Sequence, residues 1–194
     1  MRPLTSLCVY CGSAVGFAPR YRDAARRLGQ SMAENGVRLV YGGGGIGLMG
    51  IVADAVLAGG GSVVGVIPDF LESRELGHRG LSWLHVVDSM HARKNLMEQL
   101  SDAFAVLPGG LGTLDETFEI LTWRQLRLHD KPIVLIDVDG YWAPFLRLVE
   151  HVVAEGFARP DCLRLFTVID RVEDAIAVLR RAPEPVVRDI PERL

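Results

Sequence analysis

The chain is short of cysteine, and neither sign of charge dominates it. Three cysteines among 194 residues are an odd and sparse set, unlike the disulfide framework of a small secreted protein. A formal net charge of −3 gives no electrostatic basis for binding nucleic acid or an anionic membrane. We therefore expect a cytoplasmic protein with reduced thiols, whose ligands are small molecules.

Other signals are missing as well. No run of residues is long and apolar enough to span a bilayer, and the first residues lack the apolar core and cleavage site of a signal peptide. The five histidines show no zinc-binding spacing. Only two lysines occur, Lys94 and Lys131, and the surroundings of neither indicate the Schiff base of a pyridoxal phosphate enzyme. The sequence thus predicts neither a metal nor a cofactor.

What the chain does contain is a regular alternation of strand and helix patterns. Short β-branched runs bounded by Gly, Pro, Asp or Ser predict strands, and longer periodic segments between them predict helices. This order favours a single α/β domain over residues 1–181, with a doubly wound, mostly parallel sheet and helices on both faces, followed by an irregular tail at 182–194. The strands are expected at 7–10, 37–41, 62–67, 84–87, 103–107 and 133–136, and the helices at 21–34, 48–58, 91–100, 117–126, 141–155 and 172–180.

Ligands of a doubly wound sheet bind beyond the carboxyl ends of its strands. The loops that follow the predicted strands should therefore share one rim. Every motif with chemical character lies in or beside these loops. They span residues 11–17, 42–47, 68–80, 88–91 and 108–112.

Residues 108–116, with the sequence PGGLGTLDE, form the most informative motif. Bare backbone N–H groups and the positive end of a helix dipole attract phosphate, and Gly109, Gly110 and Gly112 let the backbone approach it closely. Glu116 is then either an acid that merely favours the helix start or a carboxylate placed for chemistry beside the phosphate. The motif predicts a phosphate site and leaves both roles of Glu116 open.

A second glycine motif, Gly45-Ile-Gly-Leu-Met-Gly50, has the spacing of a dinucleotide-binding fingerprint, and the acid Asp69 follows about 20 residues later. However, it follows the second predicted strand rather than the first, and its loop begins with a run of four glycines. Three interpretations stay open. They are a nicotinamide or flavin site, a turn of small residues for close packing, and additional phosphate or ribose contacts from Gly43, Gly44 and Gly45.

Cys8 and Cys11 have the C-x-x-C spacing of thioredoxin-like redox sites. Cys8 falls inside a predicted strand, however, and no helix N-terminus follows Cys11 at once to activate its thiol. We therefore interpret both as small residues at a strand end.

Two adjacent cations, Arg93 and Lys94, lie near the start of the predicted helix 91–100, where Asp88 or Ser89 can cap the first N–H groups. Cations oppose the helix dipole at that end, so a bound anion or a nearby carboxylate would explain them. The alternative is a solvated basic turn. Their position on the rim favours the ligand.

Met90-His-Ala-Arg-Lys94 and Pro108–Glu116 together resemble the paired MHxRK and PGGxGTxxE motifs of the LOG (Lonely Guy) family. The resemblance extends to about Phe157 and includes Tyr41–Gly50. Its members are cytokinin riboside 5′-monophosphate phosphoribohydrolases, often mislabelled as lysine decarboxylases. The resemblance implies a Rossmann-like homodimer or higher assembly, with no redox cofactor or metal. It also implies hydrolysis of the N-glycosidic bond of AMP-type purine nucleotides to free base and ribose 5-phosphate.

The resemblance implies the site residues as well. Glu116 is the expected catalytic carboxylate, acting as nucleophile, as base toward water or as stabiliser of an oxocarbenium ion. Arg93 is expected both to bind the substrate and to take part in catalysis. The other expected substrate contacts are Glu75, Lys94, Gly110, Leu111, Gly112, Thr113, Leu114, Asp115 and Thr122.

Two departures from the family bear on specificity. Arg127 stands where relatives commonly have a glycine, and Arg124 replaces a small residue in the same turn. Either change could alter the base pocket or an oligomer contact, so AMP is a safer expected substrate than a prenylated nucleotide. Because related folds also bind ligands without hydrolysing them, a non-catalytic nucleotide or cofactor carrier is the alternative function.

Overall fold

The computed structural model describes residues 3–72 and 77–183, and within them the chain forms one sheet of seven parallel strands in the order β4-β3-β2-β1-β5-β6-β7. The order reverses between β1 and β5, which is the switch point of a doubly wound sheet. The predicted fold class is therefore confirmed. The strands are β1 (Ser6–Tyr10), β2 (Arg38–Tyr41), β3 (Val63–Pro68), β4 (Trp83–Val87), β5 (Ala103–Val106), β6 (Ile133–Ile136) and β7 (Thr167–Ile169).

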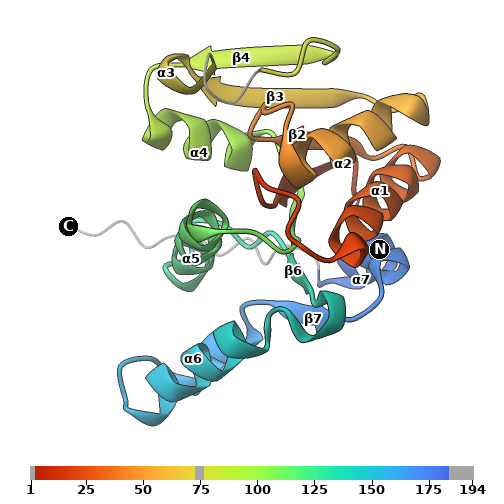
Figure 1. Ribbon diagram of the computed structural model, residues 1–194. Helices are drawn as coiled ribbons and strands as arrows, with labels where there is room; N and C mark the ends of the chain where they lie inside the picture. Colours follow the sequence, from red (N-terminus) through yellow and green to blue (C-terminus); the bar gives the residue numbers. More distant parts are fainter. Residues whose placement is uncertain (1–2, 73–76, 184–194) are drawn as a thin grey trace.

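Helices cover both faces of the sheet (Figure 1). One core packs α1, α2 and α7 against the sheet, and the other packs α4, α5 and α6. Alternate residues of β1 enter opposite cores, which explains why the whole strand is apolar. The helices are α1 (Pro19–Glu34), α2 (Gly47–Ala58), α3 (Asp69–Glu72), α4 (Met90–Gln99), α5 (Leu111–Gln125), α6 (Ala143–Ala154) and α7 (Ala175–Arg181), with the 3-10 turns η1 (Val138–Gly140), η2 (Pro160–Arg164) and η3 (Val172–Asp174).

The structure differs from the sequence-based prediction at three elements. Strand β7 and helix α3 were not expected, since both are short and their patterns are weak. Helix α5 begins at Leu111 rather than at residue 117, so Gly112 to Glu116 are helical. Glycine is tolerated at that end because the first N–H groups of a helix have no partner within it. The domain limit at residue 181 coincides with the end of α7, but it stays a prediction, because only residues 182 and 183 of the expected tail are described.

Both unusual arginines have structural contacts at the end of α5. Arg127 adopts a left-handed backbone (φ 62°), and the N–H of Leu128 donates to the carbonyl of Trp123 at 2.9 Å, as in a Schellman cap. Glycine would take that conformation without strain. Arg124 donates from Nη1 to the carbonyl of Leu165 at 2.8 Å. These two arginines therefore terminate α5 and attach it to the segment before β7.

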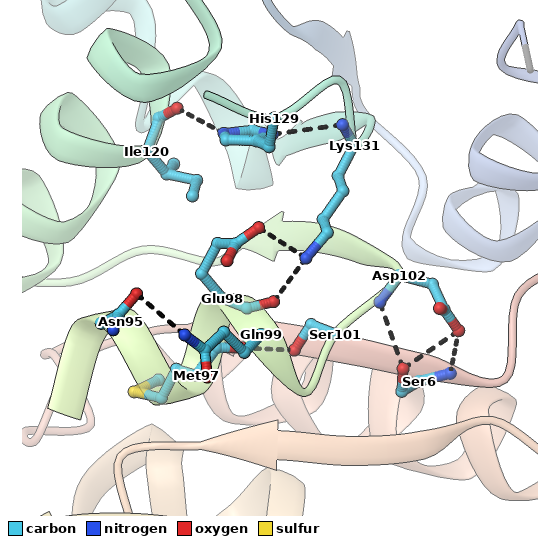
Figure 2. A network of polar contacts seen from close by, with 10 residues as sticks. All are labelled: Ser6, Asn95, Met97, Glu98, Gln99, Ser101, Asp102, Ile120, His129 and Lys131. Atoms are coloured by element: carbon cyan, nitrogen blue, oxygen red, sulfur yellow. Dashed lines mark hydrogen bonds and ion pairs between the residues drawn. The ribbon is translucent and has the colours of Figure 1, made fainter. Parts of the chain in front are cut away.

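A polar network fixes the amino ends of the central strands, at the edge opposite the rim loops (Figure 2). Asp102 accepts from the backbone N–H groups of Thr5 and Ser6 at 2.8 and 2.9 Å. Lys131 contacts both the carbonyl and the carboxylate of Glu98, at 2.6 and 2.5 Å, which joins the end of α4 to the start of β6. The second lysine of the chain is thus a structural residue far from the rim.

No helix in the described part of the chain is both long and apolar enough to cross a membrane.

His129 is held in this network as a neutral imidazole. Its Nε2 lies 2.9 Å from the carbonyl of Ile120, and its Nδ1 accepts from the N–H of Lys131 at 3.1 Å, so one nitrogen donates and the other accepts. Burial lowers the pKa of His129, more than the carbonyl of Ile120 raises it. Because the unfolded chain binds this proton more readily, stability is complete above the unfolded pKa of about 6.5 and falls as the pH decreases toward the folded pKa.

We expect His129→Gln to reduce the loss of stability that the native protein suffers between about pH 7.5 and about pH 5.5. Denaturant unfolding at the two pH values measures this difference. The exposed His151→Gln is the matched control and should keep the native pH dependence. An unchanged pH dependence in His129→Gln would contradict the assignment.

Candidate functional site

The loops after β1, β2 and β5 meet because β1 lies between the other two strands. The N–H of Gly12 donates to the carbonyl of Pro108 at 3.1 Å, and the N–H of Leu48 donates to the carbonyl of Gly12 at 2.9 Å. The shared rim predicted for these loops is confirmed.

The N-terminus of α5 is open. Its N-cap, Gly110, has no side chain to accept from the first N–H groups of the helix. No described atom lies within 4 Å of where a Cβ would stand on Gly110 or Gly112, and Leu111 is 86% exposed. An accessible helix N-terminus with unbonded N–H groups is a favourable position for a phosphate.

Thr113 contributes to this end mainly through its backbone. Its side chain is buried, and a Cβ on Gly109 would overlap its hydroxyl oxygen. The carbonyl of Thr113 accepts from the hydroxyl of Thr117 at 2.6 Å. Gly109 is therefore required for the close packing of the loop on Thr113, whereas Gly110 and Gly112 face open space.

Arg93 is 5% exposed, and its Nη2 donates to the carbonyl of Gly42 at 3.1 Å. A Cβ on Gly42 would overlap that same nitrogen. The glycine run after β2 thus makes room for the guanidinium. Sequence reasoning assigned Gly43, Gly44 and Gly45 and missed Gly42, because only the fold brings it against a residue 51 positions away.

Lys94 is 7% exposed and joins α4 to α5. Its Nζ lies 3.1 Å from Asp115 Oδ2 and 3.0 Å from Glu119 Oε1. Burial opposes its charge, but hydrogen bonds and attraction to the two carboxylates outweigh burial and raise the pKa of Lys94. Lys94 and Asp115, both expected to contact substrate, contact each other here. Glu119 was missed, although its spacing of four residues from Asp115 places both on one side of the helix.

Ser89 caps α4, as one of the two predicted candidates. Its hydroxyl accepts from the N–H of Ala92 at 3.1 Å and donates to Asp88 at 3.0 Å. The cap sets the start of α4, and so the turn from which Arg93 and Lys94 extend.

Glu116 is a partly buried residue of α5. Burial, followed by the negative charge of Glu116, raises the pKa of the Cys8 thiol, while Arg93 opposes that increase. Burial and Glu116 raise the pKa of Cys11 in the same way. Both thiols are outside any disulfide, buried and kept protonated, the opposite of a reactive redox pair. The structure therefore supports a packing role for them.

The second glycine motif also serves packing. A Cβ on Gly47 would overlap the carbonyl of Ser13, and one on Gly50 would overlap the carbonyl of Gly45. These clashes favour the interpretation as a turn of small residues. Gly43 and Gly44 are buried, and both contact the segment before β4: the carbonyl of Gly43 accepts from the N–H of His78 at 3.1 Å, and Gly44 pairs with Gly77.

Two expected contacts remain, Glu75 and Thr122. Glu75 lies outside the described residues. Thr122 is exposed on α5, nine residues beyond Thr113, so about 13–14 Å of helix separates them. Its hydroxyl donates to the carbonyl of Phe118 at 2.7 Å. Thr122 is therefore too far along α5 to join the open N-terminus of its own chain.

Comparison with known proteins identifies the family. A cytokinin riboside 5′-monophosphate phosphoribohydrolase of Rhodococcoides fascians is 47% identical over 176 residues, covering 90% of this chain and 89% of that protein. The Arabidopsis thaliana protein of the same name, LOG7, is 42% identical over 188 residues, covering 97% of this chain and 86% of that protein. The chain belongs to the LOG family.

Further comparisons agree with membership of the LOG family. Residues 49–179 match the family model described as "Possible lysine decarboxylase". Among solved structures, the molybdenum cofactor binding protein of Rippkaea orientalis has a TM-score of 0.67 at 21% identity, covering 92% of this chain and 96% of that chain. The molybdenum cofactor carrier protein of Chlamydomonas reinhardtii has a TM-score of 0.66 at 21% identity, covering 91% and 96%. At that identity these structures show a shared fold alone.

We expect Gly42→Ala to lower the free energy of unfolding by about 1–3 kcal/mol, because the added methyl group must displace the buried guanidinium of Arg93. Gly110→Ala is the matched control. Its backbone (φ −89°) suits alanine and its Cβ would meet open space, so it should change stability by less than about 0.5 kcal/mol. Denaturant unfolding of both variants tests this, and equal effects would contradict it.

Proposed function

We propose that this protein hydrolyses the N-glycosidic bond of purine nucleoside 5′-monophosphates, AMP or a cytokinin riboside 5′-monophosphate, to free base and ribose 5-phosphate. The observation that carries the proposal is the position of Glu116, between one and two turns inside a helix whose N-terminus is open to a phosphate. A phosphate-binding position and a carboxylate at one end of the same helix suit a substrate whose phosphate is attached to the reacting sugar. Both relatives are named as phosphoribohydrolases of cytokinin riboside 5′-monophosphates, which supports the same activity.

In the proposed reaction the N–H groups at Gly110, Leu111, Gly112 and Thr113 bind the 5′-phosphate. Breaking the bond from C1′ to the base nitrogen builds positive charge on the ribose, and the carboxylate of Glu116 stabilises it. Water then supplies a hydroxyl group to C1′ and a proton to the departing base. Binding the phosphate holds the sugar in place for these steps.

We assign the reacting sugar to Glu116 because it is partly buried and lies between one and two turns behind the open N-terminus of α5. Asp115 and Glu119 on the same turns contact Lys94. Arg93 is buried beside Gly42, and its guanidinium attracts the anionic substrate. Lys94 then acts by fixing α5, with Asp115 as its ligand.

Two other functions receive less support. A lysine decarboxylase would need a lysine to hold pyridoxal phosphate. Lys94 is charged and bound by two carboxylates, and Lys131 is bound by Glu98 at the opposite edge of the sheet. A non-catalytic carrier rests on likenesses of 21% identity, which concern the fold. Neither of these functions explains why the carboxylate of Glu116 lies just behind a helix N-terminus that suits phosphate.

We expect Glu116→Gln to reduce release of free base by at least about 10²-fold, since the neutral amide cannot stabilise the developing charge. Nucleotide binding should persist. Chromatographic detection of adenine from AMP, and of isopentenyladenine from its ribotide, measures the reaction. Glu155→Gln, at the exposed end of α6, is the control and should retain full activity. If the native protein releases base from no purine nucleoside monophosphate, the proposal is wrong.

We further propose a cytoplasmic homodimer that uses the exposed side of α5. Positions 111, 115, 118, 122 and 126 are spaced three or four residues apart and form one stripe. Leu111, Phe118 and Leu126 on this stripe are 86%, 41% and 63% exposed, a large apolar area for one helix. Thr122 lies on the stripe too. In such a dimer it would contact the nucleotide of the partner subunit, which explains its distance from its own site.

Light scattering should find the native protein as a dimer and Leu126→Glu as a monomer, because a buried, unpaired carboxylate is costly at an apolar interface. Leu148→Glu on α6, where the leucine is also exposed, is the matched control and should remain dimeric. A monomeric native protein would overturn the dimer. If Leu126→Glu remains dimeric, the interface lies elsewhere than on this stripe.

A further inference from the structure

Tyr141 joins the segment after β6 to the loop before α5. Its hydroxyl donates to the carbonyl of Gly109 at 2.5 Å, across 32 residues of sequence. Nothing in the proposed reaction uses this side chain.

The ring of Tyr141 is fixed from two sides. It packs edge-on against Tyr21 of α1, with centroids 5.7 Å apart, and against Trp142 at 5.1 Å. Trp142 is itself fully buried, and its backbone N–H donates to Oδ1 of Asp137, directly after β6, at 2.7 Å. The Tyr141 hydroxyl therefore extends from a rigid support.

The carbonyl of Gly109 belongs to the same planar peptide unit as the N–H of Gly110. Holding that carbonyl therefore sets the direction of the N–H at the N-cap of α5. The preceding carbonyl, of Pro108, already accepts from Gly12 at 3.1 Å. Together Gly12 and Tyr141 hold both peptide units of a loop whose glycines would otherwise be flexible.

We propose that Tyr141 is a positioning residue for phosphate: its hydroxyl fixes the Gly109–Gly110 peptide so that the N–H groups at the start of α5 converge on the anion. This inference rests on the proposed phosphate-binding role of that helix end. Without the hydroxyl, the loop must be ordered when phosphate binds, and affinity decreases. One lost hydrogen bond of ordinary strength corresponds to roughly a 3- to 10-fold change.

The test compares Tyr141→Phe with Tyr21→Phe, which lies in the same aromatic cluster and leaves the bond to Gly109 intact. We expect Tyr141→Phe to raise KM for AMP about 3- to 10-fold while kcat stays within about twofold. Calorimetry should show that its affinities for inorganic phosphate and for ribose 5-phosphate are lowered by the same factor. Tyr21→Phe should match the native protein in all three measurements.

A purely structural role gives a different result. Tyr141→Phe would then lower the melting temperature and leave KM and phosphate affinity at native values, which would overturn the inference. Phosphate calorimetry separates this inference from the proposed function. If the native protein releases no base yet binds phosphate, a weaker affinity in Tyr141→Phe still supports the positioning role, and an unchanged affinity refutes it.

Discussion

The whole site depends on the place of β1 between β2 and β5. In a parallel sheet the three strands end at one edge, so the loops after them are forced together. The contacts of Gly12 with Pro108 and Leu48 are the direct result. Once these backbones touch, the start of α5 has one available position. Arg93 on α4 is then brought to the loop that follows β2.

Buried charge is the second constraint on this arrangement. A buried cation is tolerated only when polar or charged groups compensate for the lost water. Arg93 uses a backbone carbonyl, whereas Lys94 uses the carboxylates of Asp115 and Glu119. These two neighbours in sequence therefore make different contacts: Arg93 places a buried guanidinium against the loop after β2, and Lys94 joins α4 to α5.

The glycines of the rim also fall into two groups that sequence alone does not separate. Gly42, Gly47, Gly50 and Gly109 are required because a Cβ would overlap neighbouring atoms, so they serve packing. Gly110 and Gly112 face open space, so their lack of a side chain serves access to the helix end. A fingerprint-like spacing such as that of residues 45–50 can therefore arise from packing requirements alone.

The sequence by itself determined the doubly wound fold, the shared rim, a cap of α4 at Asp88 or Ser89 and the motifs that mark the family, because these follow from local patterns of polarity and from short-range residue order. Tertiary structure decided the rest. The pairing of Lys94 with Glu119, the support of Arg93 by Gly42 and the contact of Tyr141 with Gly109 join residues on different elements, which no local pattern specifies. Residues 111–116 of the PGGLGTLDE motif likewise proved to be helical, and Gly112 is tolerated there because the first N–H groups of a helix have no partner within it.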